Sequence, residues 1–230
     1  MPSVLNDPKL EALLAALHAQ SDSQEQAMAT YYATESGGAQ RPPAQDEKSF
    51  LSDKFVALDR DKAEFCYQLC RALCARCIVE AGTSYGVSTL YLAAAVRDNA
   101  RVGGARGVVI GTEYEPAKAA AARANFAAAD LAPFIDLREG DLRETLRDVG
   151  GTVDFMLVDI WTPMARPALE LVAPRLRPGA AVVCDNTAEY REEYRDYFDF
   201  IAAQHPRLRT ATLPFRGGLE LTVCCGPFRT

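Results

Sequence analysis

The stretch Cys77–Val96, "CIVEAGTSYGVSTLYLAAAV", decides the fold of this sequence. Three apolar residues, Cys77 to Val79, precede an acid, Glu80. A turn with two glycines follows, and an apolar run of helical length begins at Val87. This order predicts a buried strand that turns directly into a helix. The glycines stand four residues apart, so the turn lacks the three-glycine G-x-G-x-x-G pattern of dinucleotide-binding proteins.

The rest of the chain repeats this alternation of short apolar runs and helical segments. The runs "GVVIGTE", "FIDLRE", "VDFMLVD" and "AAVVCDN" follow "CIVEA", and stretches of helical length separate them. Two last runs, "LRTATLPF" and "LELTVCC", are joined only by "RGG", which is too short for a helical crossover. We therefore predict an α/β fold with a doubly wound, seven-stranded, mainly parallel sheet that ends in an antiparallel hairpin.

One domain with an N-terminal accessory segment is expected. Residues 1–49 contain a predicted amphipathic helix from Leu10 to about Tyr32 and a linker, "ESGGAQRPPAQDEKS", and are expected to serve the acceptor site or a dimer contact. Residues 50–230 are expected to form the main domain, which opens with a helix from Lys62 to about Ala75.

Composition narrows the class of protein. The chain has 230 residues, 49% hydrophobic and 24% charged, with a formal net charge of -6. The negative charge and the lack of a basic run argue against a nucleic-acid partner. No apolar run reaches the roughly 20 residues of a membrane span, and the first residues do not resemble a signal peptide, so a cytoplasmic location is expected.

The cysteines and histidines are expected to have structural roles. Seven cysteines without an export signal favour free thiols. Cys66, Cys70, Cys74 and Cys77 allow a zinc site, but they lack paired C-x-x-C spacing, so we favour burial in the core. His18 and His205 are expected in surface helices or at their ends, away from catalysis.

Acidic residues recur where the predicted strands end. They are Glu80, Glu113, Asp141, Asp159 and Asp185, the last followed by Asn186. Each one alone is as consistent with a helix cap or a turn as with a site. In a doubly wound sheet, however, these ends meet at the ligand-binding edge. Carboxylates there would repel a pyrophosphate and attract the cationic sulfonium and ammonium groups of S-adenosylmethionine.

With these residues in place, the sequence resembles the class I S-adenosylmethionine-dependent methyltransferases, within them the cation-dependent catechol and caffeoyl-CoA O-methyltransferases. The resemblance starts near Phe50 and rests on "VEAGTSYGVST", "VIGTEYEP", "LVDIW" and "VVCDN". It implies a small phenolic acceptor and a homodimer. The alternatives are a metal-independent methyltransferase on a nitrogen or carboxyl acceptor and a cofactor-binding protein without turnover.

The resemblance also implies roles for single residues. Glu80 and Gly82 would lie against the methionine moiety of the cofactor, Ser88 would contact its carboxylate, Glu113 its ribose and Asp141 its adenine. Asp159, Asp185 and Asn186 would bind a divalent cation, with Mg²⁺ preferred and Ca²⁺ or Mn²⁺ as alternatives, and Asp159 would also border the cofactor.

The catalytic pair implied by the resemblance is Asp159 with Trp161, whose ring would form a wall of the acceptor site. The cation would acidify the acceptor hydroxyl. One position departs from the catechol enzymes, which have a lysine as general base directly after this tryptophan. Here the residue is Thr162, so either the metal suffices, or Lys54 or Lys62 takes the proton, or the acceptor is not a catechol.

Overall fold

The computed structural model describes residues 3–35 and 49–228. Most of the predicted linker therefore lies outside the described residues. The described elements, apart from three short 3-10 turns, are α1 (Pro8–Asp22), α2 (Glu25–Glu35), α4 (Arg60–Ala72), β1 (Cys77–Ala81), α5 (Val87–Gly103), β2 (Val108–Glu113), α6 (Pro116–Ala128), β3 (Ile135–Glu139), α7 (Leu142–Thr145), β4 (Val153–Val158), α8 (Ala165–Val172), β5 (Leu176–Asp185), α9 (Arg195–Ala203), β6 (Leu208–Leu213) and β7 (Leu219–Cys224).

The strands form one mixed sheet of seven strands, in the order β3-β2-β1-β4-β5-β7-β6. Strands β1 to β5 pair in parallel, and β7 pairs antiparallel with both β5 and β6. The predicted sheet and its C-terminal hairpin are therefore confirmed. The chain order reverses between β1 and β4, and a doubly wound sheet binds ligands at the carboxyl ends of strands at such a point.

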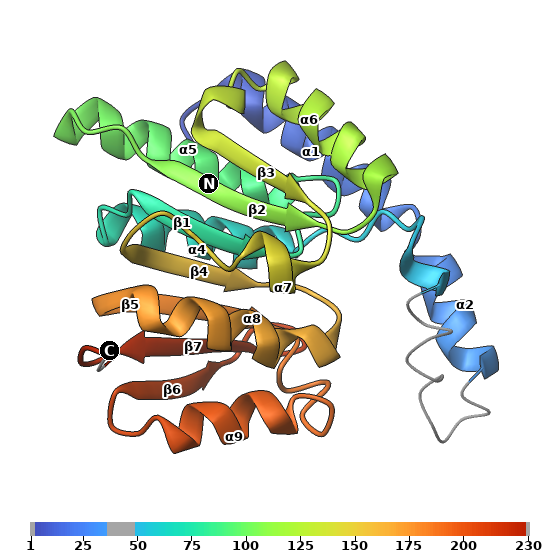
Figure 1. Cartoon of the computed structure of the whole chain (residues 1–230). Coiled ribbons are helices and arrows are strands. Elements are labelled where there is room, and N and C mark those ends of the chain that lie inside the picture. The colour runs from blue at the N-terminus through green and yellow to red at the C-terminus, as the bar shows by residue number, and fades with distance from the viewer. Residues whose placement is uncertain (1–2, 36–48, 229–230) are drawn as a thin grey trace.

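Helices cover both faces of the sheet and bury two apolar layers (Figure 1). One layer joins α1, α4, α5 and α6 to the sheet and contains large buried side chains such as Tyr91 and Phe155. The other layer lies under α7, α8 and α9 and contains Met156 and Tyr197. Burial of a Leu, Ile or Phe side chain contributes about 1.5–3 kcal/mol each, so the two layers provide the main stabilisation of the fold.

The N-terminal helix is shorter than the sequence predicts. Instead of one helix from Leu10 to about Tyr32, α1 ends at Asp22 and α2 begins at Glu25. Ser21 explains the interruption, because its hydroxyl donates to the carbonyl of Phe55 and accepts from the amide of Ala57. A contact with a segment more than thirty residues away thus sets the end of α1.

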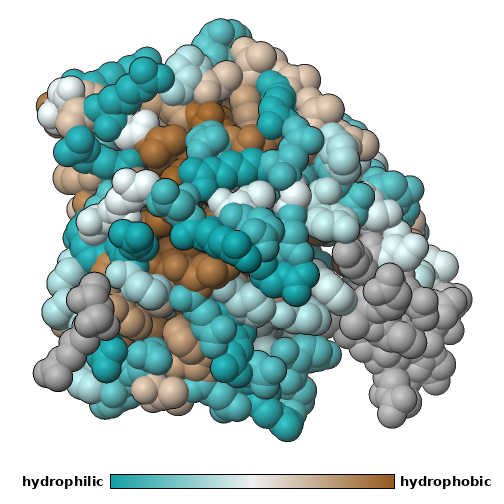
Figure 2. Space-filling view, in the orientation of Figure 1, coloured by the Kyte–Doolittle hydropathy of each residue, from teal (hydrophilic) through white to brown (hydrophobic). Residues whose placement is uncertain are grey.

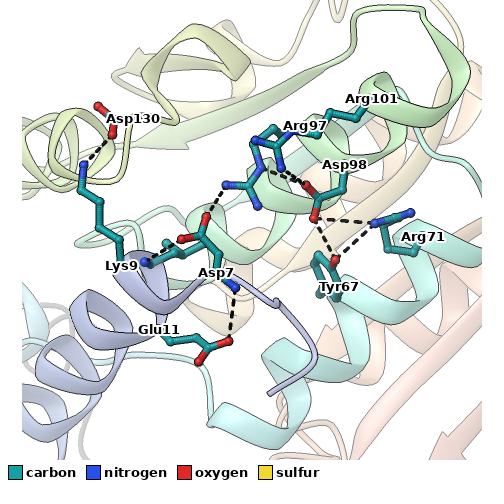
Figure 3. A network of polar contacts seen from close by, with 10 residues as sticks. Asp7, Lys9, Glu11, Tyr67, Arg71, Arg97, Asp98, Arg101 and Asp130 are labelled. Carbon is teal, nitrogen blue, oxygen red and sulfur yellow. Dashed lines mark hydrogen bonds and ion pairs between the residues drawn. The ribbon is translucent and has the colours of Figure 1, made fainter. Parts of the chain in front are cut away.

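A buried polar network fastens α1 to the core (Figure 3). The carboxylate of Asp7 caps α1 and lies 2.7 Å from Nη1 of Arg97 in α5. Nε of Arg97 lies 2.9 Å from Asp98, which also accepts a 2.9 Å hydrogen bond from the hydroxyl of Tyr67 in α4. With Leu10 and Leu14 buried in the same layer, α1 packs as part of the core. The expectation that residues 1–49 serve the acceptor site or a dimer contact stays a prediction.

The surface in the orientation of Figure 1 is mostly hydrophilic, and apolar atoms appear mainly towards its middle (Figure 2). Among the described helices, none combines the length and apolarity that crossing a bilayer requires.

Candidate active site

The glycine turn between β1 and α5 brings the backbone close to the end of β4. Gly82 has φ +96°, and a Cβ atom there would lie 2.0 Å from the carbonyl oxygen of Asp159. Gly86 also has positive φ, at +83°, and a Cβ atom would meet the ring of Phe126 at 2.4 Å. Both positions need glycine, because a side chain would be strained by φ and blocked by neighbours. The two glycines therefore serve a close approach of β1, β4 and α6.

Glu80 holds this turn from inside. Its buried carboxylate accepts hydrogen bonds from the hydroxyls of Thr83 (2.9 Å), Ser88 (2.8 Å) and Thr89 (2.5 Å). Burial raises the pKa of Glu80 above 4.5, against the effect of these three donors. The side chain does not line the cavity described below, so it acts on the site through the turn.

Glu113, at the end of β2, is placed differently. One carboxylate oxygen accepts from the amide of Ser84 at 2.7 Å, and the other accepts from the amide of Glu115 at 2.8 Å. Each oxygen keeps a further lone pair, so a diol could still be bound. The side chain lines the cavity and is mostly buried. Because its rotamer is fixed by two backbone amides, Glu113 is ready to accept hydrogen bonds from a ligand.

A cavity of about 300 Å³ opens at the carboxyl ends of β1, β2 and β4. Six of the predicted site residues line it, namely Gly82, Ser88, Glu113, Asp159, Trp161 and Asn186. Three predicted site residues do not line it, namely Glu80, Asp141 and Asp185. Asp141 instead caps α7 through the amide of Arg143 and pairs with its guanidinium at 2.5 Å. Its contact with adenine stays a prediction.

The cavity also has walls that sequence reasoning missed. Lys118 in the first turns of α6 lines it, and its Nζ donates to the carbonyl of Leu51 at 2.8 Å. Burial lowers the pKa of Lys118. The sequence feature that could have identified Lys118 as a site residue is its place as a single lysine in an alanine-rich helix just after Glu113. Six apolar or aromatic residues also line the cavity and were not among the predicted site residues: Met28, Leu51, Val56, Tyr85, Tyr190 and Tyr194.

A buried lysine lies at the far end of the site. Nζ of Lys62 in α4 is 2.7 Å from Oδ1 of Asp185, 3.1 Å from Oδ2 of Asp59 and 3.3 Å from Oδ1 of Asn186. The side chain is only 1% exposed. Burial alone would lower the pKa of Lys62, but Asp185 and Asp59 raise it above 10.5. Lys62 therefore remains an ammonium ion, which excludes it as a general base near neutral pH.

The acids around Lys62 crowd one another. Burial raises the pKa of Asp159, and the charges of Asp185 and Glu80 raise it further. Burial also raises the pKa of Asp185, while Lys62 opposes that shift. Of this group, Asp159 is the carboxylate that lines the cavity. The site thus combines Asp159, which lines the cavity, with the buried ion pair of Lys62 and Asp185, which does not.

The predicted divalent cation does not fit these residues as they stand. Carboxylate and amide oxygens are suitable ligands for Mg²⁺. However, two of the three predicted ligand residues direct an oxygen to Lys62, through Oδ1 of Asp185 and Oδ1 of Asn186. At about 4 Å and an effective dielectric constant of about 20, an ammonium ion and a divalent ion repel by about 8 kcal/mol. The ion and Lys62 could not hold the same oxygens together.

The cysteines follow the core prediction in part. Cys66 and Cys70 are buried in α4, and Cys77 is half-buried. The prediction is wrong for Cys74, which is exposed because α4 ends at Ala72 and Cys74 takes φ +47° in the turn after it. Within residues 3–35 and 49–228, no three His, Cys, Asp or Glu side chains gather as a metal ion would require.

Neither the histidines nor Lys54 contribute to the cavity lining. His18 lies 3.2 Å from the hydroxyl of Tyr91, and burial lowers its pKa. Nζ of Lys54 pairs with Asp53 and lies 4.8 Å from the ring centroid of Phe50. The cavity lining instead combines residues that follow the strand ends with Met28 and residues between 51 and 58.

Comparison with known proteins agrees with this geometry. A family described as "Methyltransferase domain" matches residues 79–187. A catechol O-methyltransferase of Mycobacterium tuberculosis is 30% identical over 132 residues, which are 57% of this chain and 57% of that protein. A catechol O-methyltransferase of Niastella koreensis is 27% identical over 135 residues, 57% of this chain and 58% of that protein. The matches span less than two thirds of these curated relatives.

Solved structures resemble a larger share of the chain. An O-methyltransferase from Bacillus cereus, solved with SAH, has a TM-score of 0.67 and 20% identity, and covers 85% of this chain and 97% of its own. The O-methyltransferase TomG from Streptomyces achromogenes, solved with SAM, has a TM-score of 0.66 and 21% identity, with coverage of 86% and 96%. Residues 79–187 therefore match the methyltransferase domain family, and the chain as a whole has the Rossmann-like fold of these solved O-methyltransferases.

Proposed function

We propose that the protein is an S-adenosylmethionine-dependent O-methyltransferase that methylates a hydroxyl of a small phenolic acceptor. The observation that carries the proposal is the single cavity that joins the glycine turn and Glu113 to Asp159, Trp161 and Asn186. A methyl donor at the first group and an acceptor at the second would meet within one cavity. The two catechol O-methyltransferase relatives support the phenolic class of acceptor.

The cofactor would bind along the ends of β1 and β2. Glu113 would accept hydrogen bonds from the ribose hydroxyls, because amides already hold both of its carboxylate oxygens in place. Gly82 leaves room for the methionine moiety, and Ser88 borders the same space. Glu80 would contribute mainly by fixing the turn that carries Gly82. The cationic sulfonium is stabilised near these acids.

The acceptor would bind between the end of β4 and the aromatic residues after β5. Trp161, Tyr190 and Tyr194 line this part of the cavity and suit an aromatic ring. The acceptor oxygen attacks the methyl carbon of the sulfonium, the carbon–sulfur bond breaks, and S-adenosylhomocysteine leaves. The hydroxyl proton passes to the ionised carboxylate of Asp159, a residue that lines the cavity. Burial raises the pKa of Asp159 to about 8, so this ionised form accumulates only as the pH rises towards 8.

The proposed reaction does not include the divalent cation that the sequence predicts, because Lys62 contacts two of its three expected ligands. Position and a fixed electrostatic field would then provide most of the rate enhancement. The other sequence-based expectations, a homodimer and a cytoplasmic location, complete the proposal. Light scattering on the purified chain tests the dimer.

The test is product analysis by mass spectrometry with a panel of catechols and S-adenosylmethionine. We expect singly methylated phenols from the wild type, and a loss of at least about 100-fold in turnover for Asp159→Asn. The exposed Asp148 gives a matched control, Asp148→Asn, which should be as active as the wild type. The proposal is wrong if the protein binds the cofactor with Asp159 intact but methylates none of the phenols.

A second candidate is methyl transfer to a nitrogen or carboxyl acceptor without a metal. The Lys62–Asp185 ion pair favours it, because such chemistry does not require a divalent cation. Nuclear magnetic resonance of the product distinguishes the two, since O-methyl, N-methyl and methyl-ester protons resonate at different positions.

A further inference from the structure

The ammonium group of Lys62 lies beside two of the residues that were predicted to bind a divalent cation. It stands in the first turn of α4, yet its ammonium group reaches the end of β5, more than 120 residues further along the chain. There it contacts Asp185 and Asn186, with Asp59 as a third partner. An ammonium ion that is 1% exposed is retained in a protein only when carboxylates and hydrogen bonds compensate for its lost hydration. The three contacts provide that compensation.

The same contacts use the atoms that a divalent cation would need. Asp185 is 5% exposed and its Oδ1 faces Lys62, while Asn186 also directs its Oδ1 to Lys62. Only Asp159 of the predicted ligand set keeps a carboxylate on the cavity. One carboxylate is a poor site for Mg²⁺ or Mn²⁺, which need several oxygen ligands in an octahedral arrangement.

The contact with Lys62 also orients Asn186. An asparagine amide has an oxygen that accepts and a nitrogen that donates. Because Oδ1 accepts from Lys62, the Nδ2 group is the donor that remains on Asn186, a residue that lines the cavity. Its N–H groups suit a hydroxyl or phenolate oxygen of an acceptor, which a metal ion would otherwise bind.

We infer that Lys62 is the resident cation of this site. Its ammonium group neutralises Asp185, excludes a divalent cation and turns Asn186 into a hydrogen-bond donor to the acceptor. Lys62 is thus a positioning residue that does not touch the acceptor. The exclusion of metal is independent of catalysis, whereas the role of Asn186 towards an acceptor rests on the proposed function.

Binding of Mn²⁺ tests the inference by electron paramagnetic resonance, without any turnover. For the wild type we expect no site tighter than about 1 mM. In Lys62→Gln, the oxygens of Asp185 and Asn186 become available, and we expect affinity for Mn²⁺ to rise at least about 10-fold. The double variant Lys62→Gln with Asp185→Asn should lose this gain. Lys9→Gln, on the surface, is the matched control and should behave as the wild type.

Two outcomes overturn the inference. One is a stoichiometric Mn²⁺ site in the wild type that Asp185→Asn removes. The other is a folded Lys62→Gln that gains no Mn²⁺ affinity. If Lys62→Gln does not fold, the comparison is repeated with Lys62→Met, which keeps most of the length of the side chain. The titration of the wild type with Mn²⁺ tests the exclusion of metal without any variant. Activity adds a separate result: the wild type should keep its rate in chelator, whereas absent activity with absent Mn²⁺ binding contradicts only the proposed function.

Discussion

Gly82 and Asp159 approach so closely that a single added carbon at Gly82 would lie 2.0 Å from the carbonyl oxygen of Asp159. The atom in the way belongs to the backbone, so it cannot rotate aside. The turn after β1 and the end of β4, which carry the two halves of the proposed reaction, are thus held at a fixed separation. The glycine spacing that first distinguished this sequence has a steric reason in this contact.

Gly82→Ala is expected to reduce both stability and cofactor binding. The new methyl group requires φ +96° at a residue with a side chain and displaces the end of β4. Strain of this kind costs about 1–3 kcal/mol. Thermal denaturation and calorimetric titration with S-adenosylhomocysteine measure the two effects. Gly103→Ala is the control, because no atom lies within 4 Å of its Cβ position, and it should leave both unchanged.

Glu113→Gln is expected to weaken cofactor binding by at least about 10-fold, or about 1.4 kcal/mol. The carboxylate accepts from the amides of Ser84 and Glu115, and an amide side chain would oppose one of these donors with its own N–H groups. Calorimetric titration measures the affinity. Glu139→Gln, at the exposed end of β3, should bind as the wild type does. Equal affinity in both variants would contradict the role of Glu113.

Asp154→Asn is expected to destabilise the fold by about 1–3 kcal/mol at neutral pH. Burial opposes the charge of Asp154, but Nε of Arg177 at 2.5 Å and the amides of Cys77 and Arg76 outweigh it and lower its pKa below 3.8. A lowered pKa gives stability that is present above the unfolded pKa and is lost as the pH falls through the folded one.

Denaturant unfolding at several pH values measures this effect. The difference between wild type and Asp154→Asn should be constant from neutral pH down to about pH 5 and shrink below about pH 4. Asp136→Asn is the control, because Asp136 forms an exposed pair with Arg138 and should contribute less than about 1 kcal/mol. A difference that grows on acidification would contradict this account.

Thiol labelling of the folded protein is expected to modify two cysteines quickly, Cys74 and Cys225, which are exposed. Burial raises the pKa of the thiols of Cys66, Cys70 and Cys184, so they remain protonated as well as inaccessible. All seven should react after unfolding. Mass spectrometry of the labelled chain gives the count, and the double variant Cys74→Ser with Cys225→Ser should show no fast phase. Fast labelling of Cys66 would contradict the structure.

The sequence predicts those parts of the fold that local patterns control. The strand Cys77–Ala81, the seven strands and the C-terminal antiparallel hairpin follow from apolar runs between glycines and helices. Strand β5 is longer than the apolar run "AAVVCDN", because it begins at Leu176 and includes Pro178 and Gly179. The pairing of β5 with β4 skips residues 177–180, so Pro178 and Gly179 lie in an irregularity of the sheet.

The candidate site is predictable where its residues end strands. Glu113, Asp159 and Asn186 line one cavity because parallel strands bring their carboxyl ends together. The contact of Lys62 with Asp185 could not be predicted, because no local pattern links residues more than 120 positions apart. Lys118 and Met28 reach the cavity for the same kind of reason, through the packing of α6 and α2.

The anchoring of α1 on α5 has a practical consequence for the expression of N-terminally truncated forms of the protein. A shortened chain that starts at Phe50 would leave the guanidinium of Arg97 without Asp7 and expose the apolar surface that Leu10 and Leu14 cover. Residues 7–17 therefore hold the outer side of α5 in place, and an affinity tag is better attached ahead of this segment than substituted for it.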